Sequence, residues 1–360
     1  MAESFNIAVF NGDGIGPEIM APTVDILKKL ATTNGNYGFE FCYAEAGARH
    51  YAETGEALPS VSLKMARDAD AILLSAMGLP TVRYEDGTEI SPQIDLRKEL
   101  NLFAGVRPVR IVAGQNTPLK LAGGQSIDFV LIRESTEGLF YSQGKGVVTK
   151  DSASETMMIT RETSEDLFKF AFSLARQRKE LGHGKGEVTC VDKANVFRAF
   201  AFFRDIFDKE AVHHKDLKAN HAYVDATALW MVTKPWDFDV LVTENMFGDI
   251  LSDLGAGLMG GLGLAPSADI GKDNAVFQPC HGSAPDIAGQ NIANPFAMIL
   301  SAAMMLEWLG LKASNEAMVT DARRLRDAVD AVVIDGTKAT RDLGGSSNTT
   351  QAGEAVLERL

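Results

Sequence analysis

The segment VLVTENMFGDILSDL, residues 240–254, joins a short apolar run to a stretch with helical spacing. Val240–Thr243 is short, apolar and β-branched, as buried strands are. In the helix that follows, residues four apart lie on one face, so Asp249 and Asp253 would present two carboxylates side by side. Two such like charges need a neutralising partner, and a hard divalent cation with oxygen ligands is one. The segment therefore predicts a strand–helix unit that carries a metal site.

The alternative for this acidic pair is a solvated helix face. We favour a metal because the neighbours Ile250, Leu251 and Leu254 predict a largely buried helix, in which carboxylates need a partner. A third carboxylate, Asp225, lies in the segment HAYVDATALWMV. On its own, Asp225 would be an ordinary helix residue.

Strand-like and helix-like runs alternate along the chain, which is the pattern of an α/β fold with a largely parallel sheet. Two stretches break the alternation. Residues from about Tyr141 to Thr160 are polar and rich in Thr and Ser, so we expect a loop or an arm there. The glycines that follow the helical start of the Asp249–Gly263 segment allow a turn or a close backbone approach. Besides Val240–Thr243, the predicted strands are Phe5–Phe10, Ala71–Ser75, Phe129–Arg133 and Glu187–Val191, and the predicted helices are Glu18–Ala31 and Glu165–Leu181.

The bulk composition is that of a globular protein. The chain has 360 residues, of which 46% are hydrophobic and 23% charged, enough for one large or two modest domains. The net charge of −13 argues against nucleic acid or an anionic membrane as the main partner. Cys42, Cys190 and Cys280 form no CxxC pair, which indicates a reducing compartment. The N-terminus has no signal-type stretch, and the most apolar segment, Ala297–Leu306, is too short to span a bilayer. We therefore expect a buried helix there and a cytoplasmic protein.

Three arginines follow apolar or turn-like segments: Arg97 in DLRKEL, Arg107 in GVRPV and Arg133 in VLIRESTEG. Arg133 closes an apolar run, where a guanidinium must be paired, and carboxylates are its natural bidentate partners. For any one of them the alternative is a salt bridge, such as Arg97 with Glu99 or with an acid elsewhere. Together they predict a site for a di- or tricarboxylate.

Three further segments carry groups that suit an active site. Lys193 in VDKAN follows an apolar strand and could act as a base, although a surface lysine is an equal alternative. Residues 281–287, HGSAPDI, form a Gly/Pro-rich loop that could wrap a nucleotide, with a structural turn as the alternative. Asn11–Glu18, NGDGIGPE, lacks the G-x-G-x-x-G spacing, so it predicts a tight turn near an active site rather than an ordinary dinucleotide site.

In this order, NGDGIGPE, NMFGDILSDL, HGSAPDIAGQNIANP and DLGGSSNTT are similar to motifs of the isocitrate/isopropylmalate dehydrogenase family of β-decarboxylating dehydrogenases. Family members act on isopropylmalate, isocitrate, homoisocitrate, tartrate or D-malate. The resemblance covers nearly the whole chain and implies an α/β, isopropylmalate dehydrogenase-like fold with two domains, not a standard Rossmann fold. It implies a first domain of residues 1–102 and 262–360 with nucleotide-binding loops. The second domain, 103–261, would carry the metal ligands, the dimer interface and a clasp arm at about 141–160.

The resemblance also implies a role for each matching residue. Mg²⁺ or Mn²⁺ would bind to Asp249 and Asp253, with Asp225 contributed by the other subunit of a homodimer. Lys193, also from the other subunit, would be the base, and Asn195 would lie near the substrate or the nicotinamide. The substrate carboxylates would bind to Arg97, Arg107 and Arg133. NAD would bind to Gly14, Ile15 and Gly16 at its nicotinamide end and to His281, Gly282, Ser283, Ala284, Asp286 and Asn294 at its adenosine half.

The sequence departs from the family pattern in two places. Phe140 stands where the family has a proton-donating tyrosine, and the next residue is Tyr141. In an extended segment the two side chains would point to opposite faces, so a bulge would have to re-aim Tyr141 as the catalytic acid. Otherwise water or Lys193 protonates the enol. Gln93 and Ile94, at the positions that select the substrate, match neither the isopropylmalate nor the isocitrate pattern.

These features predict an NAD- and metal-dependent enzyme that oxidises and decarboxylates a 3-substituted malate. Asp286 favours NAD because an acidic side chain repels the 2′-phosphate of NADP. The first choice of substrate is 3-isopropylmalate, followed by tartrate or D-malate, and then by homoisocitrate or isocitrate. The rival hypotheses are a non-catalytic regulatory subunit of the same family and an ordinary Rossmann hydroxyacid dehydrogenase.

Overall fold

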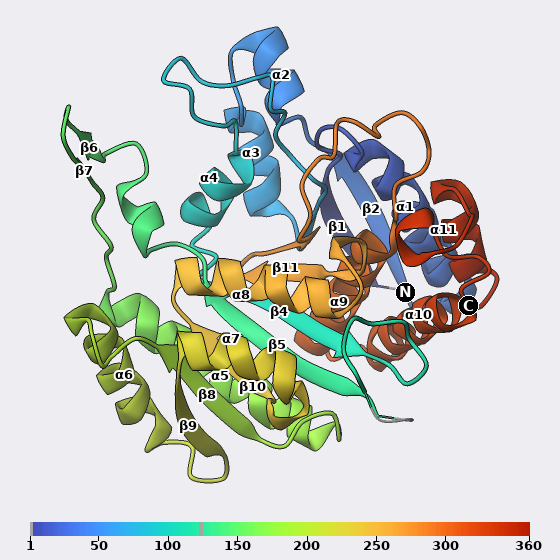
Figure 1. Cartoon of the computed structure of the whole chain (residues 1–360). Helices are drawn as coiled ribbons and strands as arrows, with labels where there is room; N and C mark the ends of the chain where they lie inside the picture. The colour runs from blue at the N-terminus through green and yellow to red at the C-terminus, as the bar shows by residue number, and fades with distance from the viewer. Residues whose placement is uncertain (1–2, 122–124) are drawn as a thin grey trace. The chain divides into compact units, whose positions relative to one another are not determined.

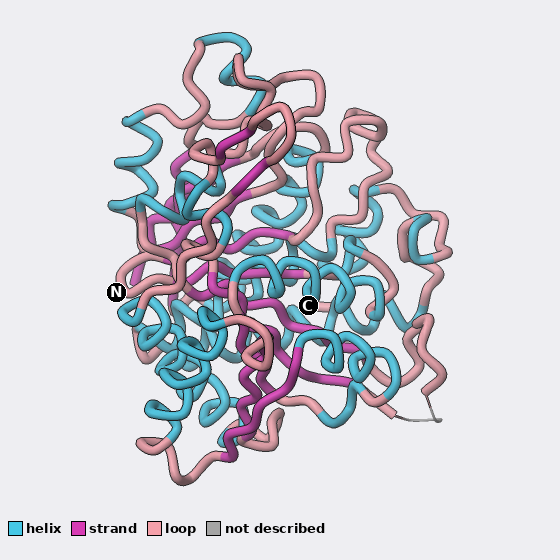
Figure 2. The backbone as a smooth tube through the Cα atoms, turned by 60° about the vertical axis from the view of Figure 1, so that its left-hand side comes forward, coloured by secondary structure: helices cyan, strands magenta, loops and turns pink. Residues whose placement is uncertain are grey.

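The computed structural model describes residues 3–121 and 125–360. The chain divides into two compact units. Unit 1 contains Met1–Leu100, Gly114–Asn116 and Gly260–Leu360, and unit 2 contains Asn101–Ala113 and Thr117–Met259. Helices and strands alternate along the backbone of both units (Figures 1 and 2). The predicted α/β class is confirmed.

The strands of unit 1 are β1 (Glu3–Phe10), β2 (Tyr37–Tyr43), β3 (Ala71–Leu74), β11 (Pro266–Ile270) and β12 (Ala275–Pro279). Their order is β2-β1-β3-β12-β11. All neighbours in this order pair in parallel except β11, which is antiparallel to β12. Strands β1 and β3 include the predicted Phe5–Phe10 and most of Ala71–Ser75, and their apolar side chains are buried from both faces, as expected for a central parallel strand.

The helices of unit 1 are α1 (Gly16–Asn34), α2 (Ala48–Thr54), α3 (Ser60–Asp68), α4 (Pro92–Glu99), α9 (Phe296–Lys312), α10 (Glu316–Asp335) and α11 (Thr349–Leu357), with short 3₁₀ turns at Leu262–Leu264 and Arg341–Leu343. Helix α9 packs on β11 and β12 and contains the predicted buried stretch Ala297–Leu306. That interpretation is confirmed, since most side chains of the stretch are buried. Among the described residues, no helix is both long and apolar enough to cross a membrane.

The strands of the unit 2 sheet are β4 (Ala104–Ile111), β5 (Ile127–Glu134), β8 (Glu187–Asp192), β9 (Lys218–Tyr223) and β10 (Val240–Thr243). Their order is β4-β5-β10-β8-β9, and only β4 runs antiparallel to its neighbour. The carboxyl ends of β5, β8, β9 and β10 therefore share one edge of the sheet. In α/β sheets, ligands bind at this edge.

The helices of unit 2 are α5 (Arg161–Glu180), α6 (Arg198–Ala211), α7 (Val224–Thr233) and α8 (Asn245–Leu258), with 3₁₀ turns at Leu139–Ser142 (η1) and Pro235–Asp237. Strands β6 (Val147–Val148) and β7 (Ala153–Ser154) form a small antiparallel hairpin that projects from the rest of unit 2 (Figure 1). This hairpin occupies the stretch expected to be a loop or an arm. Val147 and Val148 of β6 are exposed.

Helix α8 corrects one expectation about burial. Asp249 and Asp253 lie on it, as the spacing predicts, but the helix is not largely buried. Ile250 is 62% exposed and Leu254 is partly exposed, whereas Leu251 packs inward. The helix is amphipathic and the acidic pair is not deeply buried. Burial of Asp249 and Asp253 therefore does not support the predicted metal site.

Candidate active site

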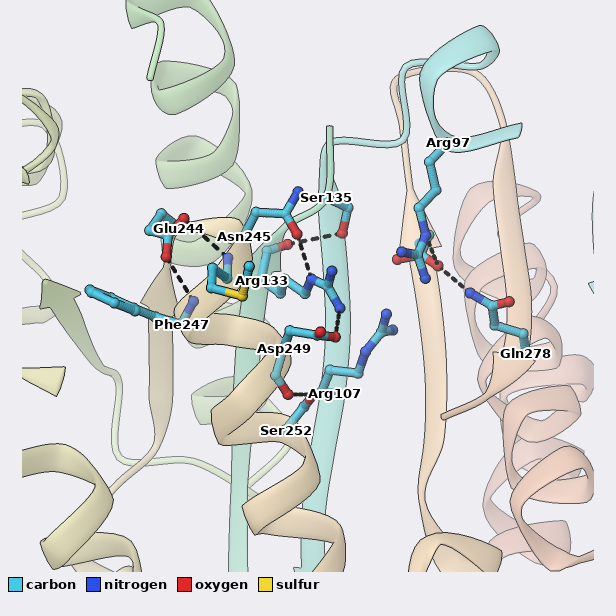
Figure 3. Close-up of polar contacts among 12 residues, drawn as sticks. Arg97, Arg107, Arg133, Ser135, Glu244, Asn245, Phe247, Asp249, Ser252 and Gln278 are labelled. Carbon is cyan, nitrogen blue, oxygen red and sulfur yellow. Dashed lines mark hydrogen bonds and ion pairs between the residues drawn. The ribbon is translucent and has the colours of Figure 1, made fainter. Parts of the chain in front are cut away.

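Arg133 and Asp249 join a sheet edge to a helix in unit 2. Arg133 lies at the carboxyl end of β5 and is almost fully buried. Its Nε donates a hydrogen bond of 2.8 Å to Oδ1 of Asn245, and its Nη1 forms an ion pair with Oδ1 of Asp249 (Figure 3). A Cβ at Gly248 would stand 2.6 Å from Cβ of Arg133, so glycine at this position allows α8 to approach β5 this closely. The motif NMFGD thus places a carboxylate against a guanidinium.

Asp253 extends this cluster by one helical turn. Burial, followed by the nearby charge of Asp249, raises the pKa of Asp253, while Arg133 and Arg107 lower it. Arg107 is on β4 and is also buried. The structure therefore brings together two of the three predicted arginines and the predicted acidic pair.

The two carboxylates would suit Mg²⁺ or Mn²⁺, because both are oxygen donors and their mutual repulsion favours a bound cation. They do not form a complete site alone. Within residues 3–121 and 125–360, no three His, Cys, Asp or Glu side chains are grouped so that they could hold a metal. Asp225 therefore does not join Asp249 and Asp253 within one chain, and its expected contribution from a second subunit stays a prediction.

Lys193 and Asp225 form a pair of their own. Lys193 directly follows β8, and Asp225 lies in the first turn of α7. Nζ of Lys193 is 2.8 Å from Oδ1 of Asp225, and this hydrogen bond lowers the pKa of the Asp225 carboxyl. The Lys193 side chain is 23% exposed and that of Asp225 68%. Asn195, two residues on, is exposed. The predicted base and the third predicted metal ligand are thus held together on one surface.

Phe140 and Tyr141 lie in η1, so the premise of an extended segment is wrong. The ring of Phe140 lies 5.4 Å from the Arg133 guanidinium, where a cation–π contact is favourable. Tyr141 is 47% exposed and has Nζ of Lys145 over its ring at 5.4 Å. Phe140, not Tyr141, faces the arginine, and no bulge re-aims the tyrosine.

In unit 1, Arg97 forms a salt bridge with an acid that is distant in sequence, which was the alternative to a role in substrate binding. Its Nε is 3.1 Å from Oδ2 of the buried Asp269, which also accepts a 2.5 Å hydrogen bond from Nε2 of Gln278 (Figure 3). This acid lies far along the sequence, so the sequence alone could not identify it. Nearby on the same helix α4, Gln93 has a buried Oε1 without a hydrogen-bond partner among the described residues. Ile94 is partly buried.

The turn at residues 11–18 is bound to the loop at 281–287. The backbone N–H of Ile15 donates to the carbonyl of Ser283 at 2.9 Å. Gly14 has φ +57°, and a Cβ there would stand 2.0 Å from that carbonyl oxygen. Gly16 is equally crowded, because its Cβ would meet the carbonyl of Asn11. The backbones of the predicted cofactor residues Gly14 and Ile15 thus lie in close contact with that of Ser283, a third predicted cofactor residue.

His281 begins the same loop, and Asn294 lies after it in the chain. Burial lowers the pKa of His281, and its Nε2 is buried with no hydrogen-bond partner among the described residues. An unpartnered ring nitrogen is costly, so a ligand atom that pairs with it would be favoured. Asn294 donates from Nδ2 to Oδ2 of Asp342 at 2.9 Å. Gly282 and Asp286 are exposed, and Ala284 adopts φ +38°.

Sequence reasoning missed two acids that fix the loops around this turn, Asp13 and Glu18. Asp13 is buried and accepts hydrogen bonds from the backbone N–H groups of Ala48, Arg49 and Gly78, which fixes the start of α2. Glu18 accepts the N–H groups of Gly289 and Asn291. Both acids lie in the motif NGDGIGPE, which predicts a turn near an active site. Their partners are distant in sequence, so the motif alone could not assign these hydrogen bonds.

Comparison with known proteins agrees with these motifs. Residues 6–356 match the family model described as isocitrate/isopropylmalate dehydrogenase. The chain is 43% identical over 358 residues to a 3-isopropylmalate/3-methylmalate dehydrogenase of Methanocaldococcus jannaschii, covering 98% of each protein. It is 40% identical over 360 residues to a homoisocitrate dehydrogenase of the same organism, covering 98% of this chain and 97% of the other.

Among solved structures, it resembles an isocitrate dehydrogenase from Methylococcus capsulatus with a TM-score of 0.84 and 36% identity, covering 99% of each chain. The predicted isopropylmalate dehydrogenase-like fold is thereby confirmed. The chain belongs to the isocitrate/isopropylmalate dehydrogenase family.

Proposed function

We propose that this protein is an NAD-dependent, Mg²⁺- or Mn²⁺-dependent dehydrogenase that oxidises and decarboxylates a 3-substituted malate. The observation that carries the proposal is the cluster of Arg107, Arg133, Asp249 and Asp253 on unit 2, in a chain of this family. Two guanidiniums beside two carboxylates can bind an anionic substrate and a cation together. A regulatory subunit without catalysis would have no need for this arrangement.

The substrate would be bound and oriented by charged groups. Arg107 and Arg133 would form charge-assisted hydrogen bonds with its carboxylates, and Arg97 is assigned the same task by resemblance. Asp249 and Asp253 would hold the divalent ion. When bound, that ion supplies Lewis-acid stabilisation of charge that develops on the substrate oxygen. Ion pairing between Arg133 and Asp249 keeps both groups in place until the ligands arrive.

Lys193 and Asp225 would act on the site of a second subunit. Lys193 would accept the proton of the 2-hydroxyl while the hydride leaves for the nicotinamide, and Asp225 would complete the metal ligands. Because the two side chains are 2.8 Å apart, one surface would deliver both. A homodimer is supported by exposed apolar side chains on unit 2, which need cover in water. They include Val196, Phe197, Leu229, Val232 and Ile250.

Protonation of the enol after loss of CO₂ would not use Tyr141. Phe140 occupies the position that faces Arg133, and its ring has no proton to give. Water or Lys193 is therefore proposed as the acid. Asn195 would contribute near the substrate or the nicotinamide.

NAD would bind to unit 1. Gly14, Ile15 and Gly16 would line its nicotinamide end, and the 281–287 loop with Asn294 would take the adenosine half. The orphaned Nε2 of His281 supports a nucleotide base as its partner. Exposed Asp286 would accept hydrogen bonds from the ribose hydroxyls and repel a 2′-phosphate.

The best candidate substrate is 3-isopropylmalate, because relatives at 38–43% identity carry that name. Homoisocitrate is supported by a relative at 40% identity, and isocitrate, tartrate and D-malate remain candidates. The unpaired Oε1 of Gln93 is the feature that could favour a polar substituent at C3.

A substrate panel tests the proposal. Each acid is mixed with Mn²⁺ and either NAD or NADP, and the rate of reduced cofactor formation is recorded. We expect NADH with at least one acid, with NAD preferred to NADP. No reduced cofactor with any acid would refute the proposed substrate class. A calorimetric Mn²⁺ titration then separates an enzyme with an unidentified substrate, which binds the ion, from a regulatory subunit, which does not.

A further inference from the structure

Asp192 holds the turn that presents Lys193. It ends strand β8, and its side chain is fully buried. Oδ1 accepts a 2.8 Å hydrogen bond from the backbone N–H of Ala194, on the far side of Lys193. Arg204 of α6 binds the same carboxylate through Nε and Nη2, both at 2.7 Å. One buried carboxylate thus ties the Lys193 turn to helix α6.

Tyr223 lies beside this ion pair. It ends strand β9 directly opposite Asp192 in the parallel register, and it is the N-cap residue of α7, the helix that carries Asp225. The Arg204 guanidinium lies 5.2 Å from the centre of its ring, and Nζ of Lys193 lies 5.8 Å from it. Both distances are within the range of cation–π attraction.

These contacts hold Lys193, the inner member of the Lys193–Asp225 pair. The Lys193 turn is fixed through Asp192, and the Lys193 ammonium lies near both the Tyr223 ring and the Asp225 carboxylate. A lysine side chain loses considerable rotamer entropy when it is held in one geometry, so an exposed Lys–Asp pair alone would be poorly ordered. The ring and the buried ion pair reduce that freedom before any ligand binds.

We propose that Arg204 and Tyr223 are positioning residues that hold Lys193 and Asp225 in their reactive arrangement. This inference rests on the proposed function, in which Lys193 is the base and Asp225 a metal ligand. Neither Arg204 nor Tyr223 need touch the substrate. Their loss should therefore affect turnover more than substrate binding, because a misplaced base slows the chemical step and leaves the carboxylate contacts intact.

The test uses Tyr223→Leu, Tyr223→Phe and Arg204→Gln in the full-length protein. We expect Tyr223→Leu and Arg204→Gln to lower kcat at least about tenfold, with KM for the acid and for NAD changed by less than about twofold. Tyr223→Phe keeps the ring but loses the side-chain hydrogen bond between Tyr223 and Arg204, so its kcat should lie between those of the wild type and Tyr223→Leu. Thermal unfolding of each variant checks that it is folded. If Arg204→Gln fails to fold, the two Tyr223 variants decide.

Arg176→Gln is the matched control, because Arg176 also binds one carboxylate, that of Asp216, through Nε and Nη2. It should leave kcat unchanged. A folded Tyr223→Leu with wild-type kcat, or with its loss confined to KM, would overturn the inference.

Crystal structures give a readout that does not depend on activity. The wild type should show the 2.8 Å contact of Lys193 with Asp225, and Tyr223→Leu should lose it. Retention of that contact in Tyr223→Leu would contradict a positioning role, whatever the kinetics. If the wild type proves inactive with every acid, the proposed function fails, and the crystal structures alone decide whether Tyr223 positions the pair.

Discussion

The two candidate binding regions are built in different ways. The region on unit 2 consists of charged side chains: Arg107 and Arg133 on strands, and Asp249 and Asp253 on α8. The loops of unit 1 instead present backbone atoms, glycines and a neutral histidine. The first arrangement suits a small, highly charged substrate with a cation. The second suits a large cofactor that needs close backbone approach and few charges.

This contrast gives unequal sensitivities. The charged region should be sensitive to loss of single charges, and the backbone region should be sensitive to the addition of a single Cβ atom. The following changes test that difference in order of the expected effect.

The largest effect is expected from Asp249→Asn. The change removes a proposed metal ligand and the charged partner of Arg133 with almost no change in shape. Mn²⁺ affinity and kcat/KM should fall by more than the roughly 100-fold that loss of an outer-sphere partner costs. Calorimetry and initial rates measure the two quantities. Asp205→Asn, which removes only an exposed pair with Lys209, is the control. Unaltered Mn²⁺ affinity in Asp249→Asn would exclude this carboxylate as a ligand.

Gly248→Ala should disturb the same region through sterics. The new Cβ would stand 2.6 Å from Cβ of Arg133, so helix and strand must separate, at a cost of about 1–3 kcal/mol in the free energy of unfolding. Urea unfolding measures it. Gly257→Ala on the same helix meets nothing within 4 Å and should be neutral or stabilising by up to about 1 kcal/mol. Equal stabilities of the two variants would contradict the close approach.

Gly14→Ala applies the corresponding test to the backbone region. It combines an unfavourable φ of +57° with a contact of 2.0 Å to the carbonyl of Ser283, so the turn must move. KM for NAD should rise, and unfolding stability should fall by more than the about 1–2 kcal/mol of the backbone term alone. Gly35 also has a positive φ, but a Cβ there would meet nothing within 4 Å. Gly35→Ala therefore measures the cost of the backbone conformation without the steric contact. An unaltered KM for NAD in Gly14→Ala would separate this turn from the cofactor.

Asp286→Lys should change the choice of cofactor. The change removes a carboxylate that repels the 2′-phosphate of NADP. The ratio of kcat/KM with NAD to kcat/KM with NADP should therefore fall by about tenfold, the equivalent of about 1.4 kcal/mol. Rates with both cofactors measure the ratio. The mutation changes an exposed side chain, so stability should hold. A constant ratio would remove Asp286 from the cofactor site.

The smallest effect is expected from Tyr141→Phe. Tyr141 is exposed in η1, and it is Phe140 that contacts Arg133, so loss of the Tyr141 hydroxyl should change kcat by less than about twofold, far below the 10²–10⁴-fold typical of a general acid. A hundredfold loss would restore Tyr141 as the proton donor.

Local patterns in the sequence predicted much of the fold and part of the site. The strand at Val240–Thr243 and the facing pair Asp249 and Asp253 follow from periodicity, which depends only on near neighbours. Burial of α8 was predicted wrongly, because Ile250, Leu251 and Leu254 suggested a largely buried helix, whereas Ile250 is exposed and Leu254 is only partly buried. That helix is half-exposed in one chain.

What the sequence could not reveal depends on contacts between distant residues. The partner of Arg97 is Asp269, and the partner of Asn294 is Asp342. The contact of the Phe140 ring with Arg133 likewise joins the 3₁₀ turn to a separate strand, and no local propensity reports it. The family resemblance assigned roles to positions but did not supply these geometries.

Removal and return of the metal tests the central claim most directly. The wild-type enzyme is assayed for NADH formation with its preferred acid, then after treatment with EDTA, and again after addition of excess Mn²⁺. We predict that EDTA abolishes NADH formation and that Mn²⁺ restores it in the wild type but not in Asp249→Asn. Full activity in the presence of EDTA would contradict the proposed role of the Asp249 and Asp253 pair.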